Sequence, residues 1–208
     1  MSHNTDNVRI VSSAPMVSPN SLIEKLPLSE KAASGVVSSR NAIKNILYGN
    51  DNRLMVLVGP CSIHDTKAAM EYAHNLLKLK EELSEDLLIV MRVYFEKPRT
   101  TVGWKGLIND PYLDESFDID KGLETARKLL VDLGEINMPV GVEYLDVLTP
   151  QYLSDLISWG AIGARTTESQ SHRELASALS CPVGFKNGTG GSLEIAFDAI
   201  QSANSPHH

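Results

Sequence analysis

Apolar residues fall in five short continuous runs, and between these runs they recur every three or four positions. A short continuous run predicts a strand that is buried on both faces. Apolar residues that recur every three or four positions predict an amphipathic helix. We expect strands at 54–61, 87–94, 139–146, 161–166 and 182–188. We expect helices at 36–47, 65–83, 123–137, 150–160, 172–180 and 192–203, with Asp65 as the N-cap of the second.

Buried strands that alternate with helices indicate βαβ units and a parallel sheet, so the fold class is α/β. Five such units fit either an open doubly wound sheet or part of a closed (β/α)8 barrel, and their number alone leaves both open. Residues 1–20 are polar and predict an extended arm that lies outside the sheet. The chain ends at SANSPHH, directly after a predicted helix and where a further strand is expected.

The overall composition excludes several classes of protein. The net charge of −7 argues against a nucleic-acid binder, which is typically basic. No apolar run approaches the roughly 18 residues that a membrane span needs, and the N-terminus lacks a secretory signal. Two cysteines do not make a disulfide framework. We therefore expect a cytoplasmic protein with reduced thiols that binds neither membrane nor nucleic acid.

Positive charge gathers at one end of the predicted sheet, because the carboxyl ends of parallel strands meet at the same edge. The cations at or just beyond these ends are Arg92, Lys97, Arg99, Lys105, Arg165 and Lys186, and the nearest carboxylates are Glu96, Glu143, Asp146 and Glu168. Half-buried cations need partner anions, so we expect ligand phosphates or carboxylates here. Solvated loop charges are the alternative, and it is weakest for Arg92 and Lys186, which lie inside apolar runs.

The two cysteines differ in their expected positions. Cys61 follows the first strand, at the same edge as the cations, so it is either a small packed side chain or a metal ligand. Cys181 precedes the fifth strand at the opposite end of the sheet, and we expect it to pack in the core. His172 precedes a predicted helix, where a capping or surface position is expected.

Four stretches are too long and unusual to be generic, namely GPCSIHD (59–65), KPRTTVGWKGLINDP (97–111), GARTTESQSHRELAS (163–177) and GFKNGT (184–189). Together they closely resemble the 3-deoxy-D-arabino-heptulosonate 7-phosphate (DAHP) synthases of enteric bacteria and yeasts. The resemblance implies a (β/α)8 TIM barrel with an N-terminal extension over 1–50. Residues 51–208 would then be the first part of the catalytic barrel, truncated after about five βα units.

The same resemblance implies a reaction and a set of site residues. The family condenses phosphoenolpyruvate with D-erythrose 4-phosphate to DAHP and phosphate, in the first step of the shikimate pathway. By matching motifs, Cys61 is a ligand to the catalytic divalent metal, which is Mn, Fe, Co or Zn. The catalytic residues are Lys97, Glu143 and Lys186, and the substrate-binding residues are Arg92, Arg99, Thr100, Lys105, Ala164, Arg165 and Lys186.

Regulation and assembly are also implied by the resemblance. The family is typically a homo-oligomer, here a dimer or tetramer, and an aromatic amino acid inhibits it, with phenylalanine and tyrosine both open. Residues that match the effector pocket are Pro150, Gln151, Leu175, Leu179 and Ser180. Ordinary helix packing is an equal alternative for these five positions.

Two departures from the family pattern affect the expected activity. The family's other metal ligands lie in its last barrel strands, and Gly190 stands where the family usually has Asp in N-G-T-D-G. We therefore expect a truncated and inactive form of the synthase. One alternative is a non-catalytic regulatory or binding product that retains the effector pocket. Another is a related barrel that joins phosphoenolpyruvate to a different aldose.

Overall fold

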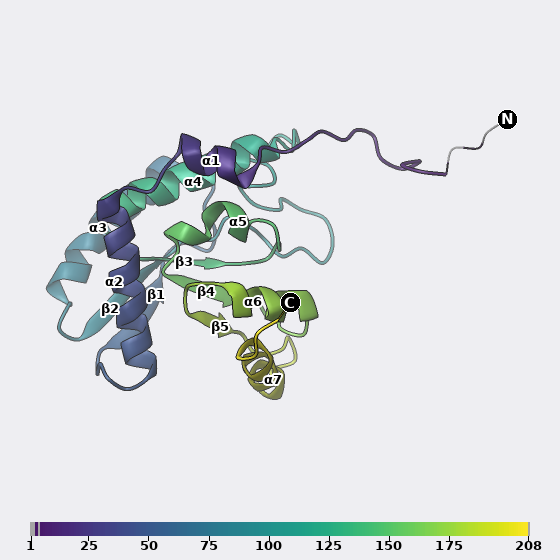
Figure 1. Ribbon diagram of the computed structural model, residues 1–208. Helices are drawn as coiled ribbons and strands as arrows, with labels where there is room; N and C mark the ends of the chain where they lie inside the picture. The colour runs from purple at the N-terminus through teal and green to yellow at the C-terminus, as the bar shows by residue number, and fades with distance from the viewer. Residues whose placement is uncertain (1–2, 4, 208) are drawn as a thin grey trace.

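The computed structural model describes residue 3 and residues 5–207, and within them one parallel sheet organises the chain (Figure 1). Its strands are β1 (Leu54–Val58), β2 (Leu87–Arg92), β3 (Val140–Glu143), β4 (Trp159–Ile162) and β5 (Val183–Phe185). Their spatial order is β1-β2-β3-β4-β5, the same as their order in the chain. A doubly wound sheet reverses its order at a switch point, so this order is that of a barrel wall. The five parallel strands form a half-barrel.

Helices follow each strand and also precede the first. They are α1 (Pro19–Lys25), α2 (Glu30–Leu47), α3 (Thr66–Glu82), α4 (Ile119–Glu135), α5 (Pro150–Leu153), α6 (Gln170–Ala178) and α7 (Glu194–Ala203). The predicted N-cap is confirmed, because the Asp65 carboxylate accepts hydrogen bonds from the backbone N–H groups of Lys67 and Ala68. An N-cap of this kind satisfies amide groups that have no partner within the helix.

The predicted helix over 150–160 is wrong beyond its first half. The α-helix ends at Leu153, a 3-10 turn covers Ser154–Leu156, and the chain enters β4 at Trp159. The backbone N–H of Ser158 donates to the carbonyl of Val140 at 3.0 Å, which joins this segment to β3. Pairing with β3 therefore overrides the helical spacing. The predicted strand over 161–166 is displaced for the same reason, and it ends at Ile162.

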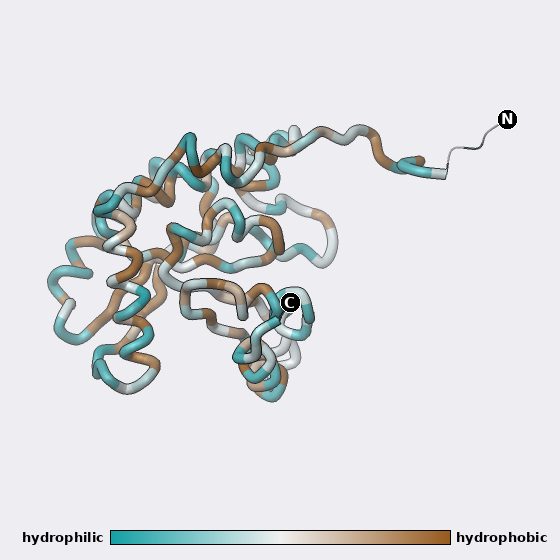
Figure 2. The backbone as a smooth tube through the Cα atoms, in the orientation of Figure 1, coloured by the Kyte–Doolittle hydropathy of each residue, from teal (hydrophilic) through white to brown (hydrophobic). Residues whose placement is uncertain are grey.

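Alternate residues of β2 face two different apolar clusters. Ile89 and Met91 pack in the main core with residues of α3 and α4. Leu88 and Val90 pack against Ile43 of α2 on the opposite, inner face. Figure 2 shows the apolar segments running through the strands. Since Arg92 follows Leu88 and Val90 in this alternation, its side chain belongs to the inner face of the half-barrel.

The inner face is filled around one large side chain, that of Trp159. A Cβ on Gly184 would lie 2.3 Å from Trp159 Cζ2, and one on Gly141 would lie 3.4 Å from Trp159 Cδ1. The two glycines belong to β5 and β3, the strands on either side of β4. The indole therefore takes the volume that two neighbouring strands leave free.

The described part of the polar arm is bonded to the body of the molecule at Val17, just before α1. Residues 5–16 run away from the body of the molecule (Figure 1). Just before α1, the Tyr152 hydroxyl donates to the Val17 carbonyl at 2.8 Å, and the Val17 N–H donates to the Asp120 carboxylate at 2.9 Å. These two bonds attach the arm to α5 and α4. Among the described residues, no helix is both long and apolar enough to cross a membrane.

Candidate active site

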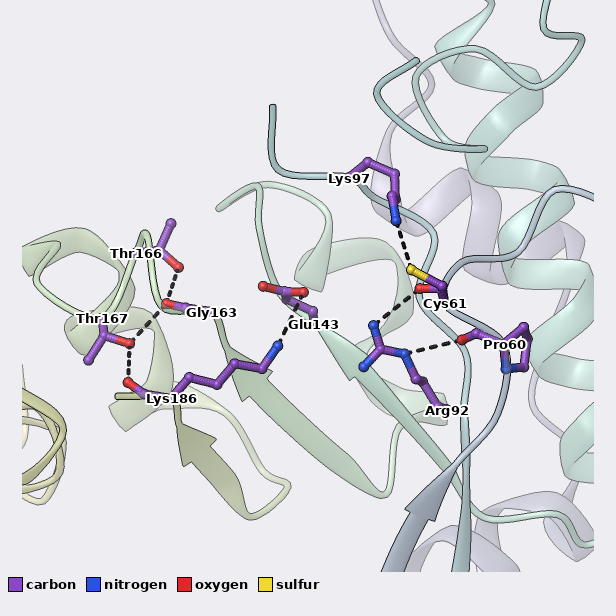
Figure 3. Close-up of polar contacts among 9 residues, drawn as sticks. All are labelled: Pro60, Cys61, Arg92, Lys97, Glu143, Gly163, Thr166, Thr167 and Lys186. Atoms are coloured by element: carbon purple, nitrogen blue, oxygen red, sulfur yellow. Dashed lines mark hydrogen bonds and ion pairs between the residues drawn. The ribbon is translucent and has the colours of Figure 1, made fainter. Parts of the chain in front are cut away.

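Polar side chains from four of the strands meet at the carboxyl edge of the sheet (Figure 3). Arg92 and Glu143 are the last residues of β2 and β3, Cys61 lies just beyond β1, and Lys186 directly follows β5. The strands are parallel members of one sheet, in which β4 separates β3 from β5, so these four ends lie at the same edge. The structure thus brings together four of the predicted site residues.

The Arg92 side chain is fixed on two sides. Its Nε donates to the carbonyl of Pro60 and its Nη2 to the carbonyl of Cys61, both at 3.1 Å. Its guanidinium carbon lies 3.6 Å from the ring centroid of Tyr94. Hydrogen bonds to carbonyl oxygens leave the positive charge uncompensated, so the guanidinium remains available to an anion.

Lys97 and Cys61 form a close pair between β1 and the loop after β2. The Lys97 Nζ donates to the Cys61 Sγ at 3.0 Å (Figure 3). This hydrogen bond, together with the positive charge of the ammonium, lowers the pKa of the Cys61 thiol. A thiolate is the form in which cysteine binds metals and reacts with electrophiles. Cys61 is exposed, so it is accessible for either role.

Glu143 and Lys186 face each other across the ends of β3 and β5 (Figure 3). Lys186 Nζ lies 3.8 Å from Glu143 Oε2, and 5.6 Å from the ring centroid of Tyr94. The carboxylate packs against Gly163, where a Cβ would lie 1.9 Å from Glu143 Oε1. The Thr167 hydroxyl lies within hydrogen-bond distance, 2.9 Å, of the carbonyls of both Gly163 and Lys186. Glu143 and Lys186 are thus held by Gly163 and Thr167, in the turn that follows β4.

The loop after β2 begins as a short hairpin over residues 96–106 that carries further cations. Glu96 and Gly106 form an antiparallel bridge, and the Lys97 N–H donates to the Lys105 carbonyl at 2.9 Å. The hairpin borders a cavity of about 230 Å³. The side chains that line it belong to Glu96, Lys97, Arg99, Lys105, Asn109, Leu145 and Asp146.

Glu96 is the most perturbed acid of this region. Its side chain is buried, with the residue only 5% exposed. Burial raises its pKa from 4.5 to about 7, and the negative charges of Asp146 and Glu143 act in the same direction. Hydrogen bonds from the backbone N–H groups of Asp146 and Leu145 oppose the rise. A carboxyl group with this pKa changes its charge near neutral pH.

The other predicted site residues lie at the same edge without joining this network. Arg165 is exposed in the turn after β4, and among the described residues it makes no hydrogen bond or ion pair. Ala164, beside it, is half-buried, and Thr100 is exposed at the tip of the hairpin. Arg99 Nε donates to the Trp104 carbonyl at 2.9 Å, which stiffens the hairpin.

Two residues of the site were missed by the sequence analysis. Tyr94 stacks under Arg92, and its hydroxyl is buried with no hydrogen-bond partner among the described residues. Its position two residues after Arg92 was a usable signal, because strand side chains repeat every second residue. Glu96 was counted only as a nearby carboxylate. No local signal distinguishes a buried loop acid from a solvated one.

Cys181 and His172 have structural positions. Cys181 is buried against Tyr144 and Gly160, which confirms that it packs in the core. His172 lies in the first turn of α6 and is half-buried, with Nδ1 2.9 Å from the Ser169 hydroxyl and Nε2 2.7 Å from the Leu145 carbonyl. Of the two expected positions, capping or surface, the structure favours the first, because the ring contacts Ser169, the N-cap residue of α6, and joins α6 to the loop after β3.

The residues of the predicted effector pocket lie on α5 and α6 and just beyond them. Pro150 is buried at the start of α5, and Leu175 and Leu179 pack partly against the main core. Gln151 and Ser180 are exposed. Packing accounts for the three apolar residues, and the two polar ones are accessible to a ligand.

The described part of the chain contains no group of three or more His, Cys, Asp and Glu side chains that could hold a metal ion. Cys61 fits one position of such a site, because its sulfur is exposed at the mouth of the half-barrel and its pKa is lowered.

Comparison with known proteins gives a consistent assignment. Residues 25–208 match the model of a protein family described as the DAHP synthetase I family. The chain is 61% identical over 207 residues to the Phe-sensitive phospho-2-dehydro-3-deoxyheptonate aldolase of Escherichia coli strain K12, covering 100% of this chain and 59% of that relative. It is 54% identical over 203 residues to the Trp-sensitive phospho-2-dehydro-3-deoxyheptonate aldolase of Buchnera aphidicola subsp. Schizaphis graminum, covering 98% and 58%.

A solved structure gives the same result for the fold. The structure of phospho-2-dehydro-3-deoxyheptonate aldolase from Francisella tularensis SCHU S4 superimposes with a TM-score of 0.94 at 55% identity, covering 96% of this chain and 58% of that one. The chain therefore spans less than two thirds of the length of the relatives that it matches.

Proposed function

The chain belongs to the DAHP synthetase I family, and from this premise we propose that the whole protein is a 3-deoxy-7-phosphoheptulonate synthase. It would condense phosphoenolpyruvate with D-erythrose 4-phosphate to give DAHP and inorganic phosphate. We propose further that the five βα units belong to a (β/α)8 barrel whose wall is completed by three more. The strand order, which follows the chain without a switch point, supports this.

The observation that carries the proposal is a set of cations with too few partner anions. Arg92 is bonded only to carbonyl oxygens and stacked on Tyr94, and Arg165 has no partner among the described residues. Lys186 has one carboxylate partner, Glu143, at the long distance of 3.8 Å. Phosphoenolpyruvate carries a carboxylate and a phosphate, so it supplies the missing charge.

Arg92 and Lys186 would hold the carboxylate and the reacting carbons of phosphoenolpyruvate, with Arg165 and the backbone of Ala164 at its phosphate. Tyr94 fixes the plane of the Arg92 guanidinium, which preserves a two-pronged geometry for a carboxylate. Cations that are fixed in place also offset the repulsion between the two anionic substrates when these are close enough to react.

Bond formation joins C3 of phosphoenolpyruvate to the aldehyde carbon of the aldose, and water then captures the cationic C2. Glu143 is the acid that would orient this water, since its carboxylate is 8% exposed and faces Lys186. Lys97 would transfer a proton to the aldehyde oxygen. The final loss of phosphate leaves the keto group of the product.

A divalent metal would act as a Lewis acid on the aldehyde oxygen when bound. Cys61 would be one of its ligands, and the described residues do not provide the others. Lys97 donates to the same sulfur, so the ammonium and a metal ion would compete for the thiolate.

The hairpin after β2 would bind the aldose. Arg99, Thr100 and Lys105 would hold the phosphate of erythrose 4-phosphate, beside the cavity of about 230 Å³. We propose an aromatic amino acid as effector, at Pro150, Gln151, Leu175, Leu179 and Ser180, and a homo-oligomer as the assembled form. The names of the relatives, Phe-sensitive and Trp-sensitive, support the effector class.

Calorimetric titration of this chain with phosphoenolpyruvate tests the site directly. We expect binding that weakens roughly tenfold or more in Lys186→Met, because a charge-assisted contact is lost. Lys78→Met, an exposed lysine on α3, is the matched control and should bind as the parent chain does. Equal affinity in all three proteins would contradict the proposed site.

The reaction itself is tested in the whole protein by phosphate release. Release should require both phosphoenolpyruvate and erythrose 4-phosphate, together with a divalent metal. If no phosphate appears with both substrates and Mn²⁺, Fe²⁺, Co²⁺ or Zn²⁺, the proposed reaction is wrong.

A further inference from the structure

The hairpin of residues 96–106 is attached to the sheet through one buried acid, Glu96. Its backbone closes the hairpin by the bridge to Gly106, while its buried carboxylate lies near the backbone N–H groups of Leu145 and Asp146, which favour its ionised form. Glu96 therefore joins the segment that carries Lys97 and Arg99 to the loop after β3. It also lines the cavity beside these cations.

Charges face Glu96 from both elements that pack against it. From β3 and its loop come the carboxylates of Glu143 and Asp146, which disfavour its ionised form. From the hairpin come Lys97, Arg99 and Lys105, which line the same cavity. Within residues 5–207, none of these three cations forms an ion pair with Glu96. The cations are thus available to a ligand, but the carboxyl group of Glu96 lines the same cavity.

We propose that Glu96 is a proton-linked positioning residue, which admits the phosphate group of a sugar phosphate into this cavity when protonated and opposes it when ionised. The proposal rests on the proposed function, in which the hairpin binds the aldose phosphate. Where Glu96 is ionised, binding takes up one proton from solvent onto its carboxylate, and no other bond is made or broken. The protonated carboxyl then faces the anion with a hydroxyl donor in place of a negative charge.

The protonation state of Glu96 in the free protein favours a linkage between anion binding and proton uptake. With a pKa of about 7, Glu96 is partly ionised at neutral pH. A divalent anion in the same cavity adds a further negative charge, and this raises the pKa of Glu96 again. Anion affinity should therefore fall as the pH rises through neutrality. A carboxylate that served only to hold the loop after β3 would show no such coupling.

Sulfate is the probe of choice, because it is divalent and does not titrate near neutral pH. Calorimetry at pH 7.5 in buffers of different ionisation enthalpy measures the protons taken up on binding. We expect uptake of roughly half a proton, and sulfate affinity that falls about 3- to 10-fold from pH 6.5 to 8.5. Arg99→Ala identifies the part of the binding that belongs to this cavity, since sulfate also fits the predicted phosphate site at Arg165.

Glu96→Gln mimics the protonated form and should bind sulfate with the same affinity at both pH values and without proton uptake. Glu71→Gln removes an exposed charge from α3 and is the matched control, with the behaviour of the parent chain. Carboxyl ¹³C shifts of the parent chain report the Glu96 pKa directly, so a Glu96 variant that fails to fold does not prevent the test. In this NMR titration of the parent chain, sulfate should raise the Glu96 pKa.

The outcomes separate this inference from the proposed function. Arg99-dependent sulfate binding without proton uptake and without a change in the Glu96 pKa overturns the role of Glu96 alone. Absence of any Arg99-dependent sulfate binding overturns the role of Glu96 as well, together with the aldose site at the hairpin. The proposed phosphoenolpyruvate site still stands if phosphoenolpyruvate binds the same sample. If neither sulfate nor phosphoenolpyruvate binds, both the proposed function and the role of Glu96 are wrong.

Discussion

The ammonium of Lys97 lies 3.0 Å from the sulfur of Cys61, and this pair joins the end of β1 to the hairpin after β2. The two residues are 36 positions apart in the chain, so the parallel pairing of β1 with β2 creates the contact. Each of the two residues thus finds its partner in a distant segment of the chain. The chemical consequence of this contact is a cysteine with a lowered pKa at an exposed position.

Replacing Lys97 should therefore make Cys61 less reactive. Lys97→Met removes the hydrogen bond and the nearest positive charge, so the pKa of the thiol rises and less thiolate is present at pH 7. We expect alkylation by iodoacetamide to slow by roughly 3- to 10-fold. Lys105→Met is the matched control, since Lys105 is not among the groups that lower the pKa of Cys61. Cys181 is buried and does not interfere. Unchanged alkylation in Lys97→Met would show that the contact has no influence in solution.

Two glycine substitutions should have opposite outcomes. A Cβ on Gly184 would lie 2.3 Å from the indole of Trp159, so Gly184→Ala should reduce the free energy of unfolding by about 1–3 kcal/mol. Gly190 has open space around it and no left-handed φ, and Gly190→Ala should change stability by less than about 1 kcal/mol, with a gain expected. Urea unfolding followed by circular dichroism measures both. Equal losses would mean that Trp159 does not fill the inner face.

Much of the arrangement at the strand ends was predictable from the sequence. Arg92, Glu143 and Lys186 lie at the ends of apolar runs, and parallel strands bring such ends to one edge. The helical spacing of 150–160 was misleading, because the pairing of Ser158 with Val140 is a contact between distant segments that local periodicity does not contain. The burial of Glu96 was unpredictable for the same reason. It depends on how the hairpin meets the loop after β3.

Arg127 offers a test of the packing that supports the sheet. Its fully buried guanidinium donates to the carbonyls of Leu26 and Tyr152, at 2.9 and 2.7 Å, and to both carboxylate oxygens of Asp155 at 2.8 Å. Arg127→Ala leaves these acceptors without their donor, and we expect a loss of about 3–5 kcal/mol in the free energy of unfolding. Lys128→Ala, in an exposed pair with Asp132, should cost less than about 0.5 kcal/mol. Losses of similar size for the two variants would contradict a structural role for the buried guanidinium.

Glu96 should also make the stability of the fold depend on pH. Its pKa is raised from 4.5 to about 7, so the folded state binds more protons than the unfolded state between these values. Stability that this group contributes is therefore present below about pH 4.5 and is lost as the pH rises through 7. Between pH 5 and pH 8 the parent chain should lose on the order of 2–3 kcal/mol relative to Glu96→Gln, which has no charge to bury.

Urea unfolding at a series of pH values measures this difference, with Glu71→Gln as the exposed control that should follow the parent chain. The comparison uses the change with pH and not the absolute stability, because Gln also loses part of the hydrogen bonding to Leu145 and Asp146. Asp146→Asn removes one of the like charges near Glu96 and should move the transition to lower pH. Parallel pH profiles for the parent chain and Glu96→Gln would show that Glu96 is ionised, or solvated, throughout this range.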